Sequence, residues 1–223
     1  MKTKRYVVGV LMSWVLVGLM ALPVSAGPIT FNLDVEFSGA TAPAGSSPWV
    51  TATFEDVVGG GVQLTINALN LTGTEFISEF YFNLDPAKNA ALFLPGVPGG
   101  GTQTDWNSIS AGSNAFKADG DGFFDFVVDF PPPGDRFTAG ETFIVNWGAG
   151  TGLTTADFNF ASVDGPVGKT GFHAAAHVHG IGADGAYSGW IGAGPAPVPD
   201  GGATLVLLGL GLMGLSAWRG RSA

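Results

Sequence analysis

Short stretches in which apolar and polar residues alternate are the feature that most restricts how the middle of this chain can fold. Successive side chains of an extended strand point to opposite faces, so a period of two places the apolar ones on one face of a sheet. The alternation is clearest over residues 29–37, 62–68 and 76–84. Apolar runs predict further strands over residues 50–58, 123–130, 142–147, 158–163 and 172–181.

Turn-forming residues separate these segments, since the chain contains 36 glycines and 14 prolines. Gly59, Gly60 and Gly61 predict a tight link between two strands, because glycine adopts a positive φ without steric cost. The Gly- and Pro-rich residues 95–104 predict a longer surface loop. Eight short strands joined by turns predict an all-β fold, an antiparallel two-layer sandwich of the jelly-roll type, in one domain over residues 27–194.

The N-terminus has the three parts of a secretion signal. Basic residues at positions 2, 4 and 5 precede an apolar run over residues 7–22, and small side chains lead up to Ala26. This order predicts a signal peptide over residues 1–26, cleaved after Ala26. The alternative is a retained transmembrane anchor, but the helix-breaking Pro23 favours cleavage.

The C-terminus carries a second apolar segment, residues 201–218, which contains no charge. At about 1.5 Å per residue it would form a helix of about 27 Å, close to the hydrocarbon core of about 30 Å. Arg219 and Arg221 follow directly, and positive charge holds such a tail, residues 219–223, in the cytoplasm. A buried core helix is the alternative, but Gly209, Gly211 and Gly214 and a basic end favour a transmembrane helix.

A proline-rich spacer, residues 195–200, joins the domain to this segment. It leads into the motif Val198, Pro199, Asp200, Gly201 and Gly202. The motif, the apolar segment and the basic tail together resemble the PEP-CTERM class of sorting signals, in its Val-Pro-Asp variant. The chain departs from the name-giving motif, with Asp200 where glutamate is usual and Gly201 where proline is usual.

This resemblance implies a destination and a partner. An exosortase, which is a membrane-embedded transpeptidase, recognises such signals and cuts near them in Gram-negative bacteria that make exopolysaccharide. The body is also similar to a group of PEP-CTERM proteins with one sandwich domain, through Asn83-Leu84-Asp85-Pro86, residues 137–141 and Ser188-Gly189-Trp190. That group has no agreed biochemical activity, so the resemblance implies a fold and a location rather than a reaction.

The charge of the body excludes some partners. Residues 27–199 keep four of the nine basic side chains and 17 of the 18 acidic ones, which gives a net charge of −13. A field of this sign repels nucleic acid and anionic lipid, and divalent cations are its natural counter-partner. The favoured alternative is that the acidity only keeps an exported protein soluble. The chain has no cysteine, so its stability must come from an apolar core.

An acidic segment offers a candidate calcium site. Asp119, Asp121 and Asp125 are spaced so that their carboxylates could converge on a hard cation from a loop that contains two glycines. The alternative is an acidic β-turn, because Asp-Gly pairs close hairpins for conformational reasons alone. Calcium is therefore the one candidate cofactor, and it remains a hypothesis.

Two aromatic sets also allow two interpretations. His173, His177 and His179 would share one face of a strand, as zinc ligands can, but the first two would lie about 13 Å apart along it. Polar partners on an exposed face are therefore favoured. The tryptophans of the body could stack on sugar rings or belong to the core, and the core is favoured; they are Trp49, Trp106, Trp147 and Trp190.

The function that follows is that of an exported surface or matrix protein without enzymatic activity. Its expected partners are an exosortase-type transpeptidase and, through residues 201–218, the membrane. Its sandwich would act as a structural or interaction module in an exopolysaccharide-rich envelope. The alternative is a carbohydrate-binding module, with or without calcium. A hydrolase would need two carboxylates in one cleft, and no spacing selects such a pair.

Overall fold

The computed structural model describes residues 27–93, 95–119, 122–131, 135–148, 150–163 and 171–194. The expected signal peptide, proline-rich spacer, sorting motif and C-terminal helix lie outside these residues. The part of the chain that is described contains ten strands and two short 3-10 helices. None of its helices is long and apolar enough to span a membrane.

The strands follow most of the predicted segments closely. Seven predicted strands are confirmed within two residues at each end. The ten strands are β1 (Ile29–Glu36), β2 (Val50–Asp56), β3 (Val62–Asn67), β4 (Phe76–Phe82), β5 (Ser108–Lys117), β6 (Phe123–Asp129), β7 (Phe137–Thr138), β8 (Thr142–Trp147), β9 (Ala174–Ile181) and β10 (Tyr187–Ala193).

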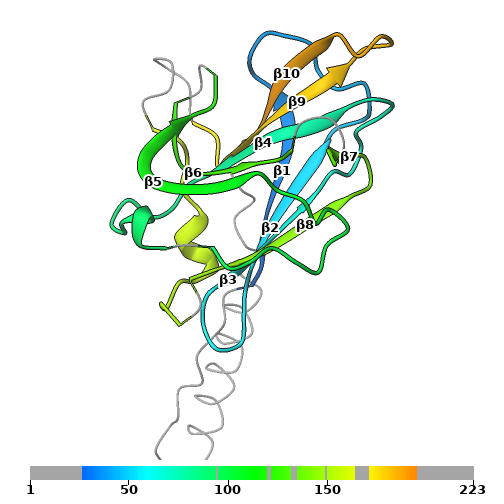
Figure 1. Ribbon diagram of the computed structural model, residues 1–223. Coiled ribbons are helices and arrows are strands. Elements are labelled where there is room, and N and C mark those ends of the chain that lie inside the picture. The colour runs from blue at the N-terminus through cyan, green and yellow to red at the C-terminus, as the bar shows by residue number, and fades with distance from the viewer. Residues whose placement is uncertain are drawn as a thin grey trace, which may run out of the picture.

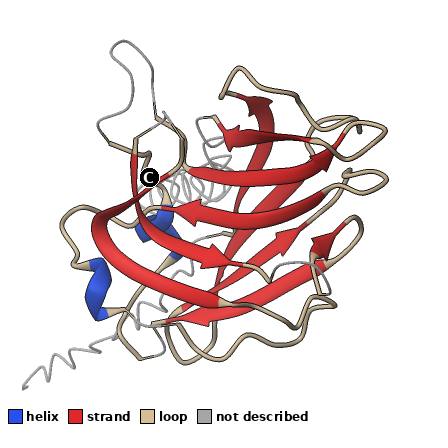
Figure 2. Ribbon diagram, turned by 45° about the horizontal axis from the view of Figure 1, so that its top comes forward, coloured by secondary structure: helices blue, strands red, loops and turns tan. Residues whose placement is uncertain are grey.

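All strand pairs are antiparallel, as predicted, but they form one continuous sheet instead of two separate ones. The order is β5-β6-β4-β9-β10-β1-β2-β3-β8, and β7 pairs with β4. The strands curl around the core, so that the two halves of the sheet face each other (Figure 2). The link between the halves is the pairing of β1 with β10, in which Leu33 lies opposite Ala193. The fold is therefore sandwich-like and all-β, with the two layers joined along one side.

Aromatic side chains from both halves meet in the core. Phe82 of β4 lies at its centre, with its ring 4.7 Å from that of Phe126 of β6 and 5.2 Å from that of Trp147 of β8. The ring of Phe54 of β2 lies 5.5 Å away. All four side chains are fully buried. Burial of such large apolar surfaces is the main source of stability in a domain without disulfides.

The prediction of a strand over residues 158–163 is wrong. The segment Thr155–Phe158 forms a 3-10 helix, η2, and only Val163 makes an isolated bridge, with Phe123. The apolar side chain at position 158 is explained by core packing and not by a place in the sheet, because the buried Phe158 ring stacks on Phe54 at 4.7 Å. Hydrophobicity alone does not distinguish these two reasons for burial.

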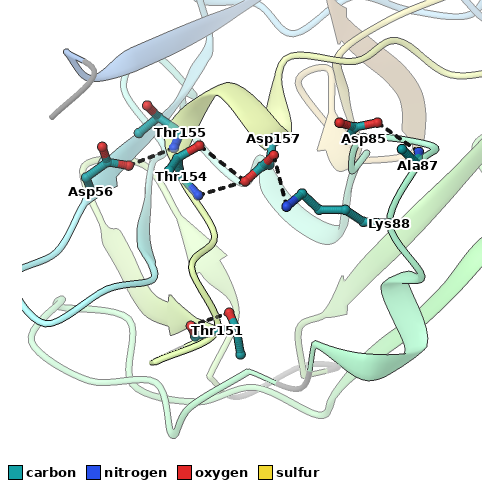
Figure 3. A network of polar contacts seen from close by, with 9 residues as sticks. Asp56, Asp85, Ala87, Lys88, Thr151, Thr154, Thr155 and Asp157 are labelled. Atoms are coloured by element: carbon teal, nitrogen blue, oxygen red, sulfur yellow. Dashed lines mark hydrogen bonds and ion pairs between the residues drawn. The ribbon is translucent and has the colours of Figure 1, made fainter. Parts of the chain in front are cut away.

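A polar network holds η2 against the rest of the domain (Figure 3). The Asp157 carboxylate accepts a hydrogen bond of 2.8 Å from the Thr154 backbone N–H, which is part of a capping box. It also lies 3.4 Å from the Lys88 ammonium, in the segment after β4. The Thr155 backbone N–H donates to Asp56 Oδ1 of β2 at 2.7 Å. The network therefore ties η2 to segments distant in sequence.

The glycine-rich loop predicted over residues 95–104 covers the free edge of β8. Its backbone N–H groups at Gly96, Gly99 and Gln103 donate to carbonyl groups of β8 at 2.7 to 2.9 Å. A Cβ added to Gly101 would lie 2.0 Å from the Thr142 carbonyl oxygen, so only glycine fits this close approach. Covering an edge strand in this way hides unpaired backbone groups that would otherwise pair with another chain.

The chain enters and leaves the domain at the same end. The first strand, β1, and the last, β10, are antiparallel neighbours, with Ala193 at the end of β10 opposite Leu33, so the start of β1 and the end of β10 lie toward the same end of the domain. The β9–β10 hairpin lies at the opposite end (Figure 1, orange). The start of β1 and the end of β10 therefore both lie away from this hairpin.

Candidate functional site

A row of polar and aromatic side chains crosses the outer face of the sheet. The strand register places Asp129 of β6 opposite Glu79 of β4, Glu79 opposite His177 of β9, and His177 opposite Trp190 of β10. All four are partly buried, whereas residues adjacent to them, such as Val128 and Phe80, point into the core. We call these four residues the outer row. Strand register alone brings them together from four separate strands.

Aromatic rings extend the outer row toward the β9–β10 hairpin. The imidazole of His177 stacks on Trp190, with ring centroids 4.3 Å apart and planes 6° apart. The His179 ring lies 4.0 Å from that of His177, and the Phe76 ring lies 5.4 Å from that of His179. The Arg136 guanidinium lies 4.0 Å from the centre of the Phe76 ring. These contacts form a continuous ladder of π systems across β4, β9 and β10.

Charge links Glu79 of the outer row to the titratable side chains around it. His177 Nδ1 lies 3.7 Å from Glu79 Oε2. The interaction with His177 lowers the pKa of the Glu79 carboxyl, even though burial acts in the opposite direction. Burial, and then the charge of Glu79, raises the pKa of the Tyr81 hydroxyl. Burial, followed by the neighbouring His177, lowers the pKa of His179. At neutral pH, Glu79 is therefore anionic and His179 is neutral.

The outer row borders a groove made of two adjoining hollows. The first has a volume of about 460 Å³, and its lining includes Glu79, Asp129 and His177. The second, of about 390 Å³, includes Arg136, Asp184 and Tyr187. Phe76 and His179 line both hollows, so we treat them as one feature, the outer groove. Each hollow alone falls within the range of about 300–1,000 Å³ that is common for small-molecule sites.

Two residues of the calcium hypothesis, Asp119 and Asp125, do not lie in one loop. Asp119 is exposed and has a φ of 44°, and Asp121 lies outside the described residues. Asp125 lies within β6 and is buried, where Oδ2 accepts from the Leu84 N–H at 2.9 Å and Oδ1 from the Asn114 N–H at 2.7 Å. The Asp125 carboxylate thus has a structural role. Calorimetric titration of calcium into metal-free protein, with Asp121→Ala as control, tests the hypothesis, and a flat trace would end it.

The prediction that the three histidines share one face of a strand is wrong. His177 and His179 lie side by side on the outer face, but His173 precedes β9 and stacks on the buried Phe31 ring at 5.1 Å. Among the described residues, no group of three or more His, Asp or Glu side chains is arranged to hold a metal ion. The favoured interpretation is that these histidines have polar partners on an exposed face, and His177 has such a partner in Glu79.

The tryptophans divide into two pairs. Trp147 is fully buried and Trp49 is 8% exposed, which confirms the predicted core position for both. Trp106 and Trp190 are only partly buried, and they pack against two different apolar clusters. Trp190 is therefore the tryptophan that belongs to the outer row.

Sequence reasoning missed most of the groove. Glu79 lies in a predicted strand and Asp129 in another, but no pattern indicated that these strands are neighbours. Arg136 and Tyr187 lie in segments that carried no prediction. The one usable signal was the alternation within residues 76–84, which places Glu79 on the polar face of its strand.

The described residues thus form an all-β, sandwich-like domain with a groove on the outer face of its sheet. Beyond the domain, residues 197–222 match the VPDSG-CTERM motif. The chain therefore carries a PEP-CTERM-like sorting signal, with Gly201 where the motif's name has serine. Such a signal indicates an exported protein that is processed at a membrane. Comparisons with curated proteins and with solved structures found no significant match.

Proposed function

We propose that this protein is an exported component of the cell surface or extracellular matrix, which an exosortase-type transpeptidase recognises through residues 198–202. The observation that carries the proposal is the match of residues 197–222 to the VPDSG-CTERM motif. In this proposal, residues 1–26 direct export and residues 201–218 hold the precursor in the inner membrane. The β domain then acts without catalysis, as a structural or interaction module in an exopolysaccharide-rich envelope.

The geometry of the domain supports this arrangement. Because β1 and β10 are antiparallel neighbours, the chain ends of the domain leave it at one end. A membrane segment at that end would leave the β9–β10 hairpin, at the opposite end, facing outward (Figure 1). Gly185 and Tyr187, in and beside that hairpin, line the second hollow of the outer groove. The groove would therefore stay accessible both before and after cleavage of the tail.

Deleting residues 198–223 is expected to release the domain from the membrane fraction into the medium, because both the motif and the apolar segment are lost. Cell fractionation with immunoblotting measures the distribution, and intact mass identifies the processed ends. A matched control replaces Pro195 and Pro197 with alanine, which alters the spacer and keeps the motif. Continued membrane association of the truncated protein would contradict the proposal.

A second candidate function is carbohydrate binding by the outer groove. The groove combines aromatic rings with carboxylate, amide and hydroxyl groups at an open surface, and sugar rings need both kinds of contact. Among the groove-lining residues, Tyr187 is 56% exposed and is therefore available for stacking. This candidate concerns what the displayed domain binds, and it is compatible with the proposed sorting.

A further inference from the structure

We propose that the outer groove binds a glycan that carries free amino groups, such as a polymer of unacetylated glucosamine. This inference rests on the carbohydrate-binding candidate and names the class of sugar. It is carried by the arrangement of the carboxylates, by the length and lining of the groove, and by the charge of the domain.

Within the part of the chain that the structure describes, the carboxylates of the first hollow have no lysine or arginine as an ion-pair partner. Glu79 and Asp129 lie directly opposite each other on neighbouring strands, and like charges in such positions destabilise a sheet. Asp129 accepts a hydrogen bond from the Ser108 hydroxyl, which carries no charge. Among the described residues, no lysine or arginine forms an ion pair with either carboxylate, and the side-chain partners of Glu79 are His177 and the uncharged Tyr81 hydroxyl. A ligand ammonium group between the two would remove the repulsion and form charge-assisted hydrogen bonds.

The shape of the groove favours a chain of sugars over a single small cation. The two hollows adjoin at Phe76 and His179, which extends the lining from Asp129 to Tyr187. An exposed tyrosine at one end can pack against the apolar face of a sugar ring. Asn107, Ser78 and Ser188 supply amide and hydroxyl groups for sugar hydroxyls along the way.

The charge of the whole domain also favours a glycan that carries free amino groups. With a net charge of −13 over residues 27–199, the domain repels glycans that contain uronic acids. Arg136 is the cationic side chain that borders the groove among the described residues, and it lies in the second hollow, over Phe76. The acidic subsite is therefore the first hollow, where the amino group of one sugar unit would sit.

Isothermal titration calorimetry with the full-length protein in detergent micelles tests the proposal. The probes are a glucosamine hexamer, the fully N-acetylated hexamer and a uronic acid hexamer. We expect the glucosamine hexamer to bind at least about tenfold more tightly than the acetylated one, because acetylation removes the charge that Glu79 and Asp129 recognise. The uronic acid hexamer should not bind. Raising the salt concentration should weaken binding of the glucosamine hexamer.

Matched variants locate the subsite. The double variant Glu79→Gln with Asp129→Asn should lose about tenfold or more in affinity for the glucosamine hexamer. Glu55→Gln removes the same kind of charge from an exposed position on β2 and should change nothing. Tyr187→Ala should weaken both glucosamine-based hexamers about equally, since stacking does not depend on the amino group.

Several outcomes would overturn the proposal. If the glucosamine hexamer and the acetylated hexamer bind with equal affinity, and Tyr187→Ala weakens both, the groove binds carbohydrate but does not recognise the amino group. Binding of a lysine hexamer with the same affinity and the same sensitivity to the double variant would indicate simple cation exchange. Failure of all sugars to bind would remove both the inference and the carbohydrate-binding candidate. The sorting proposal would stand, because fractionation tests it separately.

Discussion

Phe82→Ala is expected to lower the free energy of unfolding of the domain by about 3–5 kcal/mol, the range for removing a buried phenylalanine from a core. The fully buried Phe82 ring contacts aromatic rings from both halves of the curled sheet, including Phe126 and Trp147. Truncation would leave a cavity between the halves, which rigid strands fill only in part. Because domains are commonly stable by only about 5–15 kcal/mol, this single change removes a large share of the stability.

Urea denaturation followed by tryptophan fluorescence measures this effect, since Trp147 lies next to the cavity. Leu92→Ala is the matched control, because the Leu92 side chain is 73% exposed and its truncation should change stability by less than about 0.5 kcal/mol. An equal denaturation midpoint for the two variants would mean that the halves of the sheet do not pack through Phe82.

Asp125→Ala is expected to destabilise the domain by about 1–3 kcal/mol, the cost of leaving a buried N–H group without a partner, because the buried Leu84 N–H would lose its acceptor. The carboxylate accepts from the backbone N–H groups of Leu84, after β4, and Asn114, in β5. Asn114 has a φ of 51° and lies where the register between β5 and β6 shifts. Asp125 therefore holds an irregular part of an edge strand in place.

Hydrogen exchange provides the local measurement for Asp125→Ala, since the Leu84 and Asn114 amides should exchange faster than in the parent protein. Asp119→Asn is the control, because Asp119 is exposed, belongs to the same acidic segment and has a φ of 44°, which asparagine tolerates. Unchanged stability of Asp125→Ala would show that the carboxylate is not needed for the fold. It would then be free to serve the calcium hypothesis.

Strands with regular alternation were predictable. In β2 and β3, apolar residues such as Phe54 and Leu64 recur at every second position and are fully buried, so the sequence carries the period of the sheet. The Gly59–Gly61 link was also predictable, since all three residues have φ between 91° and 99°. The sequence alone therefore predicts a strand where buried and exposed side chains alternate regularly along it.

The strands β5, β7 and β10 were not predicted, for reasons specific to each. The edge strand β5 is mostly polar and contains a register shift, so it shows no clear alternation. The strand β7 has only two residues. In β10, Gly189 and Gly192 replace apolar side chains because neighbouring atoms occupy the space where a Cβ would lie. A glycine backbone that is buried against the Thr41 carbonyl or the Phe172 ring leaves no hydrophobic signal in a sequence.

The sequence by itself determined the sorting signal at residues 197–222 and predicted a signal peptide over residues 1–26, because a short motif and a run of charge or apolarity are read along the chain without folding. It also determined the all-β class, since the period of two is a local property. The curl of one sheet into two facing halves and the meeting of Asp129, Glu79, His177 and Trp190 were decided only by the tertiary structure. Which strands become neighbours depends on how the whole core packs, and that energy is shared among residues far apart in the chain.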